Sequence, residues 1–103
     1  MASKINSKPK VHDLKIAPDH FIGVFSGQKK AEYRLNDRDF KVNDVLLLRE
    51  IHCGSYTGRS ICAVITHILD IDDFHDFPDN APFAGYVMLS INLIPGTAKL
   101  EAK

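Results

Sequence analysis

Alternating apolar and polar residues predict strands along most of this chain. The clearest pattern covers residues 85–94, where Val87, Leu89, Ile91 and Leu93 occupy every second position. Because successive side chains of a strand point to opposite faces of a sheet, this segment is expected to cover a core with one face. Similar patterns predict strands at residues 11–16, 29–35, 44–52 and 59–71.

One segment shows helical spacing instead. Phe21, Val24 and Phe25 recur at i, i+3 and i+4 and form one apolar stripe on a helix of about two turns. Pro18 suits the first helical position and Gly27 the residue after the helix end. The glycines in residues 52–58 predict a hairpin connection. Together these elements predict an α+β fold, a five- to six-stranded small β-barrel with one short helix at its mouth, because closure removes exposed strand edges.

The same patterns assign side chains to faces. In residues 29–35, Ala31, Tyr33 and Leu35 are expected to face the core, with Glu32 and Arg34 facing outward. In residues 44–52 the apolar run 45–48 predicts cover on both faces, after which Arg49 and Glu50 are expected to emerge. In residues 59–71 one parity places Ile61, Ala63, Ile65 and His67 on a common face.

Length and charge narrow the possible functions. The 103 residues fit one domain at 11–95, between flexible tails at 1–10 and 96–103. The composition, 45% hydrophobic and 25% charged, is typical of a soluble globular protein. Thirteen basic and thirteen acidic side chains cancel, so long duplex nucleic acid is a disfavoured ligand and any nucleic-acid contact must come from local patches.

Several other classes of protein are disfavoured. No apolar run reaches the ~18 residues of a membrane span, and the N-terminus lacks a signal-peptide pattern, which together predict a cytoplasmic protein without membrane contact. Cys53 and Cys62 lie in apolar surroundings and are expected to be buried, inert thiols. His67, His75 and the nearby aspartates do not have the spacing of a calcium loop, so neither a metal site nor another cofactor is expected.

The polar segment at residues 27–44 is the main candidate site. A strand entered through Gly27 would present Lys29, Glu32 and Arg34 in fixed positions, and the arginine fork suits phosphate or a base edge. A surface ion pair between Glu32 and Arg34 is the structural alternative. Residues beyond this strand are further candidates for ligand contact, and each also has a structural interpretation: Lys15, Asn36, Asp37, Arg38, Tyr56 and Arg59.

Tyr56 and Arg59 lie in a glycine-flanked loop, where a tyrosine beside an arginine could stack on an unpaired base. The alternative is a hairpin tyrosine that packs on its own strands. His12 is expected to be a hydrogen-bonded structural residue.

The chain contains, in order, HDLKI, a helix ending in glycine, GQKKAEYRLNDRDFKVND, LLLRE and YTGR. These segments resemble an ASCH-like domain of the PUA-like superfamily, in particular a small phage- and bacteria-encoded branch of unknown function. The resemblance covers residues 11–93. Its signature G-x-K-x-x-E-x-R is met by Gly27, Lys29, Glu32 and Arg34. The extension N-D-R-x-F followed by V-x-D is also present, although Asn43 replaces the usual glycine before Asp44.

The resemblance implies a PUA-like barrel that binds short single-stranded RNA or a nucleotide-like ligand in a cleft beside the helix. Some similar small proteins are hydrolases that deacylate modified cytidine nucleosides with a lysine, a threonine and a glutamate. The lysine corresponds to Lys29, but Glu32 stands at the threonine position, so enzymatic activity is uncertain and any catalysis would centre on Lys29 and Glu32. A third hypothesis is a phage-type adaptor or inhibitor that binds a host protein.

Overall fold

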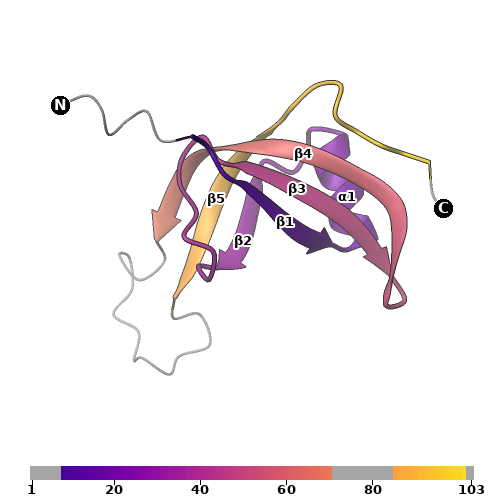
Figure 1. Ribbon diagram of the computed structural model, residues 1–103, viewed down its shortest axis with the longest axis horizontal. Coiled ribbons are helices and arrows are strands. Elements are labelled where there is room, and N and C mark those ends of the chain that lie inside the picture. The colour runs from indigo at the N-terminus through magenta and orange to yellow at the C-terminus, as the bar shows by residue number, and fades with distance from the viewer. Residues whose placement is uncertain (1–7, 71–84, 102–103) are drawn as a thin grey trace.

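The computed structural model describes residues 8–70 and 85–101, which form a strongly curved sheet with one helix (Figure 1). The elements are β1 (Val11–Ile16), α1 (Pro18–Phe25), β2 (Ala31–Leu35), β3 (Val45–His52), β4 (Ser55–Asp70) and β5 (Tyr86–Leu93). Each strand and the helix predicted from the sequence is therefore present. His75 and the aspartates that follow Asp70 lie outside the described residues.

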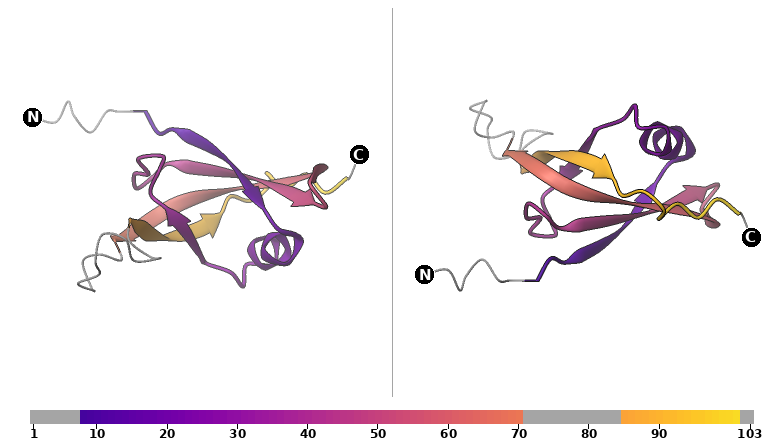
Figure 2. Two further views of the ribbon diagram at one scale, coloured as in Figure 1. Left: turned by 90° about the horizontal axis from the view of Figure 1, so that it is seen from below. Right: turned by 90° about the horizontal axis from the view of Figure 1, so that it is seen from above.

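The strands follow the order β1-β3-β4-β5-β2 in one five-stranded sheet. β1 runs parallel to β3, and the other neighbours are antiparallel. The long strand β4 pairs first with β3 and then with β5, and the sheet curls along it (Figure 2). In the part of the chain that the structure describes, the sheet ends at β1 and β2. The observed form is thus a curled half-barrel with one short helix, which agrees with the predicted α+β, barrel-like class.

Helix α1 connects the two edge strands and packs against β3 and β4. Its Phe21 and Val24 are fully buried, whereas Phe25 is exposed. Phe25 was predicted to share the apolar stripe, but it is the last residue of the helix and its side chain is exposed. The core that the helix joins consists of apolar side chains from β1, β3, β4 and β5 and of Phe40 from the loop after β2: Leu14, Ile16, Phe40, Leu46, Leu48, Ile61, Ala63, Ile65, Val87, Leu89 and Ile91.

The predicted orientations of two carboxylates are wrong. In β2 the faces are reversed: Glu32 is buried, while Tyr33 and Leu35 are exposed. In β3 the carboxylate of Glu50 is buried instead of emerging into solvent. Both errors have one cause, because each carboxylate is neutralised by an arginine and can therefore enter the core.

The hairpin between β3 and β4 is tighter than the predicted connection at residues 52–58. Only Cys53 and Gly54 form the turn, with φ of 52° and 80°, and Ser55 already belongs to β4. Cys53 is exposed and Cys62 is half-buried, so the prediction of two buried thiols is wrong. Further along β4, an irregularity between Ile65 and His67 shifts the register, and His67 faces solvent.

Candidate functional site

Two arginine side chains cross the space between the edge strands β1 and β2. Arg34 of β2 donates from Nη2 to the main-chain oxygen of Lys15 at 2.7 Å. Arg38, in the loop after β2, donates from Nη1 to the main-chain oxygen of Asp13 at 3.1 Å. An edge strand presents unpaired carbonyl oxygens, and these two guanidinium groups bind two of them. The arginines are therefore fixed in position at the open side of the half-barrel.

Glu32 organises the residues of the G-x-K-x-x-E-x-R segment. Its Oε2 accepts a hydrogen bond from Arg34 Nε at 2.7 Å, and its Oε1 lies 3.6 Å from Lys29 Nζ. The main-chain N–H of Lys29 is bound in turn by the carbonyl of Gly23 in α1. The carboxylate thus links the end of the helix to the arginine that reaches β1. Each carboxylate oxygen faces one of the two cations, so Glu32 positions both of them.

A cavity of about 270 Å³ opens beside the two arginines; we call it the arginine cleft. Tyr33 and Tyr86 line this cleft, and their rings have centroids 5.3 Å apart and planes inclined by 30°. Arg34 is largely covered, whereas about 43% of the Arg38 side chain is accessible. The cleft combines guanidinium donors with aromatic surface, and its lining consists of Leu14, Tyr33, Arg34, Leu35, Asp37, Arg38 and Tyr86.

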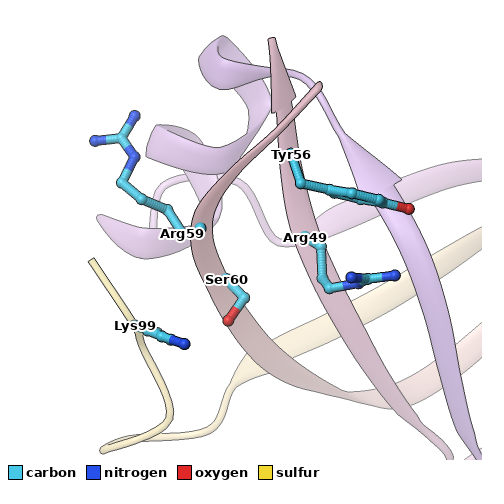
Figure 3. Close-up of a pocket in the computed structure, with 6 residues that line it drawn as sticks. Arg49, Tyr56, Arg59, Ser60 and Lys99 are labelled. Atoms are coloured by element: carbon cyan, nitrogen blue, oxygen red, sulfur yellow. The ribbon is translucent and has the colours of Figure 1, made fainter. Parts of the chain in front are cut away.

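A second cavity, of about 340 Å³, lies at the β3–β4 hairpin; we call it the Arg49 pocket (Figure 3). The guanidinium carbon of Arg49 is 4.0 Å from the centroid of the Tyr56 ring, a cation–π contact. Figure 3 shows these two side chains together, while the Arg59 side chain extends in another direction. Gly58, Arg59, Ser60 and Lys99 complete the lining.

Arg59 is bound to the buried carboxylate of Glu50. Arg59 Nε and Nη2 donate to its two oxygens at 2.8 and 2.7 Å, and Thr57 Oγ1 donates at 2.8 Å. The hydrogen bonds from Arg59 lower the pKa of Glu50, burial opposes this effect, and the bond from Thr57 adds to the lowering. The same pair raises the pKa of Arg59. The Glu50–Arg59 pair joins the end of β3 to the start of β4. Beside it lies a cavity of about 330 Å³, whose lining consists of Pro18, Glu50, His52, Thr57, Arg59 and Leu100.

His12 is structural, as predicted. Its Nε2 lies 2.8 Å from Oδ2 of Asp44, and both side chains are buried. The main-chain N–H groups of Lys10 and Lys41 also donate to Asp44, each at 3.0 Å. Burial raises the pKa of Asp44, but these hydrogen bonds outweigh it and the net shift is downward.

The structure divides the predicted site residues among separate places. Arg34, Asp37 and Arg38 line the arginine cleft, and Lys15 meets it through its carbonyl. Tyr56 and Arg59 line the Arg49 pocket on the other side of β1. Lys29 lines a further cavity of about 300 Å³ beside the helix end. Asn36 accepts a hydrogen bond from Phe40 N–H at 3.4 Å, a bond that closes its own turn.

Sequence reasoning did not single out several residues of these cavities. Tyr86 was only included in the strand predicted at residues 85–94, and Arg49 was only expected to emerge from the strand at residues 44–52. Lys99 falls in the segment expected to be a flexible tail, yet it forms an antiparallel bridge with Ser60. The interspersed charges in TAKLEAK contain no signal for this pairing, because the partner strand lies far away in the sequence.

Residues 8–70 and 85–101 contain neither a cluster of metal ligands nor a membrane-spanning helix. No group of three or more His, Cys, Asp or Glu side chains is arranged to hold a metal ion there. No helix in that part of the chain is long and apolar enough to cross a membrane.

A family model described as a domain of unknown function (DUF3850) matches residues 11–91. The chain belongs to this family. The DUF3850 match runs from the start of β1 into β5, so it includes every residue of the arginine cleft, whereas Lys99 of the Arg49 pocket lies beyond it.

A similar protein is found in Escherichia phage P2, where it is described as an uncharacterized 12.9 kDa protein in the GpA 3′ region. It is 38% identical to this chain over 65 residues. The matched part is 63% of this chain and 60% of the phage protein, so the match spans less than two thirds of that relative. The predicted relationship to a small phage and bacterial family of unknown function is thus confirmed.

Proposed function

We propose that this DUF3850 protein binds short single-stranded RNA or a nucleotide-like ligand in the arginine cleft. The observation that carries the proposal is the pair of guanidinium groups, Arg34 and Arg38, fixed on neighbouring carbonyls of β1 beside two tyrosine rings. Binding groups that are already held in place lose little entropy when a ligand arrives. Guanidinium groups suit phosphate, and tyrosine faces suit unstacked bases.

The arginines keep donors for a ligand after making these contacts. A guanidinium group has five N–H donors. Arg34 uses Nε for Glu32 and Nη2 for Lys15, which leaves Nη1 without a partner among the described residues. Arg38 uses Nη1 for Asp13, and its Nε is 3.9 Å from the exposed carboxylate of Asp37. Phosphate oxygens could therefore bind at the mouth of the cleft without breaking the contacts that hold the arginines.

The resemblance to ASCH-like domains supports the same assignment. Three residues of the resembling signature, Lys29, Glu32 and Arg34, form one ionic network in this fold. We propose that the half-barrel is a PUA-like fold and that the network supports a nucleic-acid-binding edge. The net charge of zero favours a short ligand, because only local cations are available to replace counterions.

Fluorescence anisotropy with labelled single-stranded RNA tests the proposal. We expect Arg38→Ala to weaken binding about tenfold and to reduce the slope of log K against log salt by about one, because one phosphate contact is lost. Lys41→Ala is the matched control, since Lys41 is exposed and, within residues 8–70 and 85–101, its ammonium group pairs with nearby Asp39 alone. The proposal fails if both variants bind RNA as the wild type does, or if the wild type binds none.

A hydrolase acting on an acylated nucleoside is a second candidate. Its support is the Lys29–Glu32 contact of 3.6 Å, at a cavity of about 300 Å³ that Lys29 lines. Turnover of acetylated cytidine by the wild type and its loss in Lys29→Ala would establish this activity. It is the weaker candidate because Glu32 is only 6% exposed, whereas a general base must come within hydrogen-bond reach of its substrate.

An adaptor that binds a host protein is the third candidate. Tyr33, Leu35 and Met88 are exposed on the outer face of β2 and β5, where Tyr33 pairs with Met88. Contiguous apolar surface of this kind can bind a protein. Capture of one partner by the wild type, abolished by Met88→Glu with RNA affinity unchanged, would favour the adaptor.

A further inference from the structure

The Arg49 pocket and the arginine cleft are connected through a single residue of β1. Arg38 binds the main-chain oxygen of Asp13, and Arg49 Nε binds its Oδ1 at 2.8 Å. Lys15, whose carbonyl holds Arg34, pairs in register with Arg49 of β3. Neighbouring strands are about 4.8 Å apart, so the Arg49 wall of the pocket lies one strand spacing from β1. Ser60 of β4 pairs with both Arg49 and Lys99, so the Lys99 wall lies about three spacings, or ~14 Å, from β1.

The Arg49 pocket is a built cavity. Lys99 is held by two main-chain hydrogen bonds to Ser60, at 2.8 and 2.7 Å. Thr97 fixes the preceding turn, because its Oγ1 donates to Ile94 and accepts from the N–H of Cys62. On the opposite wall, the ring of Tyr56 is held by the guanidinium of Arg49. The main chain at residue 99 and the aromatic wall are thus both positioned before any ligand binds.

The charges of this pocket favour an anion. Arg49, Arg59 and Lys99 contribute cations to the lining, which contains no carboxylate. Arg59 is neutralised by Glu50, and Arg49 is paired with Asp13 on its Nε side. Lys99 makes no ion pair within the described residues. The remaining positive charge therefore comes from Lys99 and the free edge of Arg49, and about 45% of Tyr56 is exposed beside them.

We propose that the Arg49 pocket binds a second nucleotide of the same single-stranded nucleic acid, so that the strand crosses β1 between the two cavities. A base would stack on Tyr56, and its phosphate would bind Lys99 and Arg49. The volume of about 340 Å³ is within the range of small-ligand sites. This inference rests on the proposed function and specifies it further: the preferred ligand is an oligonucleotide of about four residues, the lower end of site sizes on comparable small barrels.

A ladder of ligand lengths tests the inference. Affinities for a mononucleotide and for single-stranded oligonucleotides of increasing length are measured with wild type, Lys99→Ala, Tyr56→Ala, Arg38→Ala and the control Lys41→Ala. We expect the wild type to bind the tetranucleotide far more tightly than the mononucleotide. Lys99→Ala and Tyr56→Ala should each weaken tetranucleotide binding about tenfold and leave mononucleotide binding unchanged. Lys99 is suited to this test because its side chain supports no ion pair in the described structure.

The outcomes separate the two proposals. If Arg38→Ala weakens binding but Lys99→Ala and Tyr56→Ala behave like Lys41→Ala, the second subsite is refuted and the proposed function stands. Equal affinity of the wild type for mononucleotide and tetranucleotide refutes the subsite as well. If Lys99→Ala and Tyr56→Ala weaken binding but Arg38→Ala does not, the path across β1 is wrong. A wild type that binds no nucleic acid overturns both proposals.

Discussion

Glu32, Asp44 and Glu50 are buried carboxylates, and each accepts hydrogen bonds from specific donors. Burying a charge is costly unless it is paired and hydrogen-bonded. The carboxylate of Asp44 forms a hydrogen bond with the ring of His12 in β1. It also accepts hydrogen bonds from the main-chain N–H of Lys10, before β1, and from that of Lys41, before β3. The side chain of Asp44 thereby joins the start of β1 to the turn that leads into β3.

We expect Asp44→Asn to lower the free energy of unfolding by about 2–3 kcal/mol, because an amide NH₂ would face a donor and leave it unsatisfied. Urea unfolding at neutral pH measures the loss. The control is Asp39→Asn, which removes an exposed charge from the same turn and should change stability little. Equal effects of the two substitutions would contradict the role assigned to Asp44.

The lowered pKa of Asp44 also predicts a pH dependence. A carboxylate with a lower pKa in the folded state contributes stability above its ordinary value of 3.8. That contribution is lost as the pH falls through the lower, folded-state pKa. Urea unfolding across the acid range should therefore show a steeper decline for the wild type than for Asp44→Asn. Parallel curves would show that Asp44 titrates alike in the folded and unfolded chains.

At the scale of the elements, the hairpin between β3 and β4 supports the Arg49 pocket. Cys53 and Gly54 both have positive φ, and His52 pairs with Ser55, the geometry of a two-residue type I′ turn. Asparagine tolerates this conformation better than cysteine does. Cys53→Asn should thus stabilise the protein by about 0.5–1 kcal/mol, or about 3–6 °C in Tm. Thermal unfolding measures this change in Tm. Cys53→Val is the control and should lower Tm, because a β-branched residue fits a positive φ poorly. An unchanged Tm in both variants would rule out the turn effect.

The elements were predictable from the sequence, but the directions of some side chains were not. Period-two alternation located β1 and β5, an unbroken apolar run located β3, and Pro18 located the start of α1. In β2 the alternation was also correct, but hydropathy placed Glu32 on the solvent face. The charge of Glu32 is neutralised by Lys29 and Arg34, and these ion pairs depend on side-chain geometry that hydropathy does not describe. The partners of Glu50 and Asp44 come from other strands and turns, which a local pattern does not specify.

The candidate site shows the same limit. Arg34 and Arg38 were singled out from a polar segment and do meet at one cavity. Tyr56 was singled out for the same ligand but lies across β1, because β3 and β4 extend past the edge strand. Pairing between strands that are distant in the sequence decides which polar segments become neighbours. In this protein the parallel β1–β3 pair and the Ser60–Lys99 bridge bring the residues of the two cavities together.

At the scale of the whole molecule, arginine side chains connect the two ends of the curled sheet. Arg34 holds both the buried carboxylate of Glu32 and the carbonyl of Lys15, so it joins β2 to β1. Removing it leaves Glu32 with Lys29 alone, at 3.6 Å. We expect Arg34→Leu to destabilise the fold by about 3 kcal/mol, because a buried carboxylate loses its main partner. Arg38→Leu, which breaks a more exposed contact with β1, should cost much less.

The double substitution Glu32→Leu/Arg34→Leu separates the ion pair from the connection between strands. Replacing a buried pair by apolar side chains is often close to neutral, so the double variant should recover most of the stability that Arg34→Leu loses. It cannot restore the hydrogen bond to Lys15, so amide hydrogen exchange in β1 should remain faster than in the wild type. Urea midpoints and residue-resolved exchange measure the two effects independently. A double variant as unstable as Arg34→Leu would mean that the link to β1, and not the burial of Glu32, makes Arg34 important.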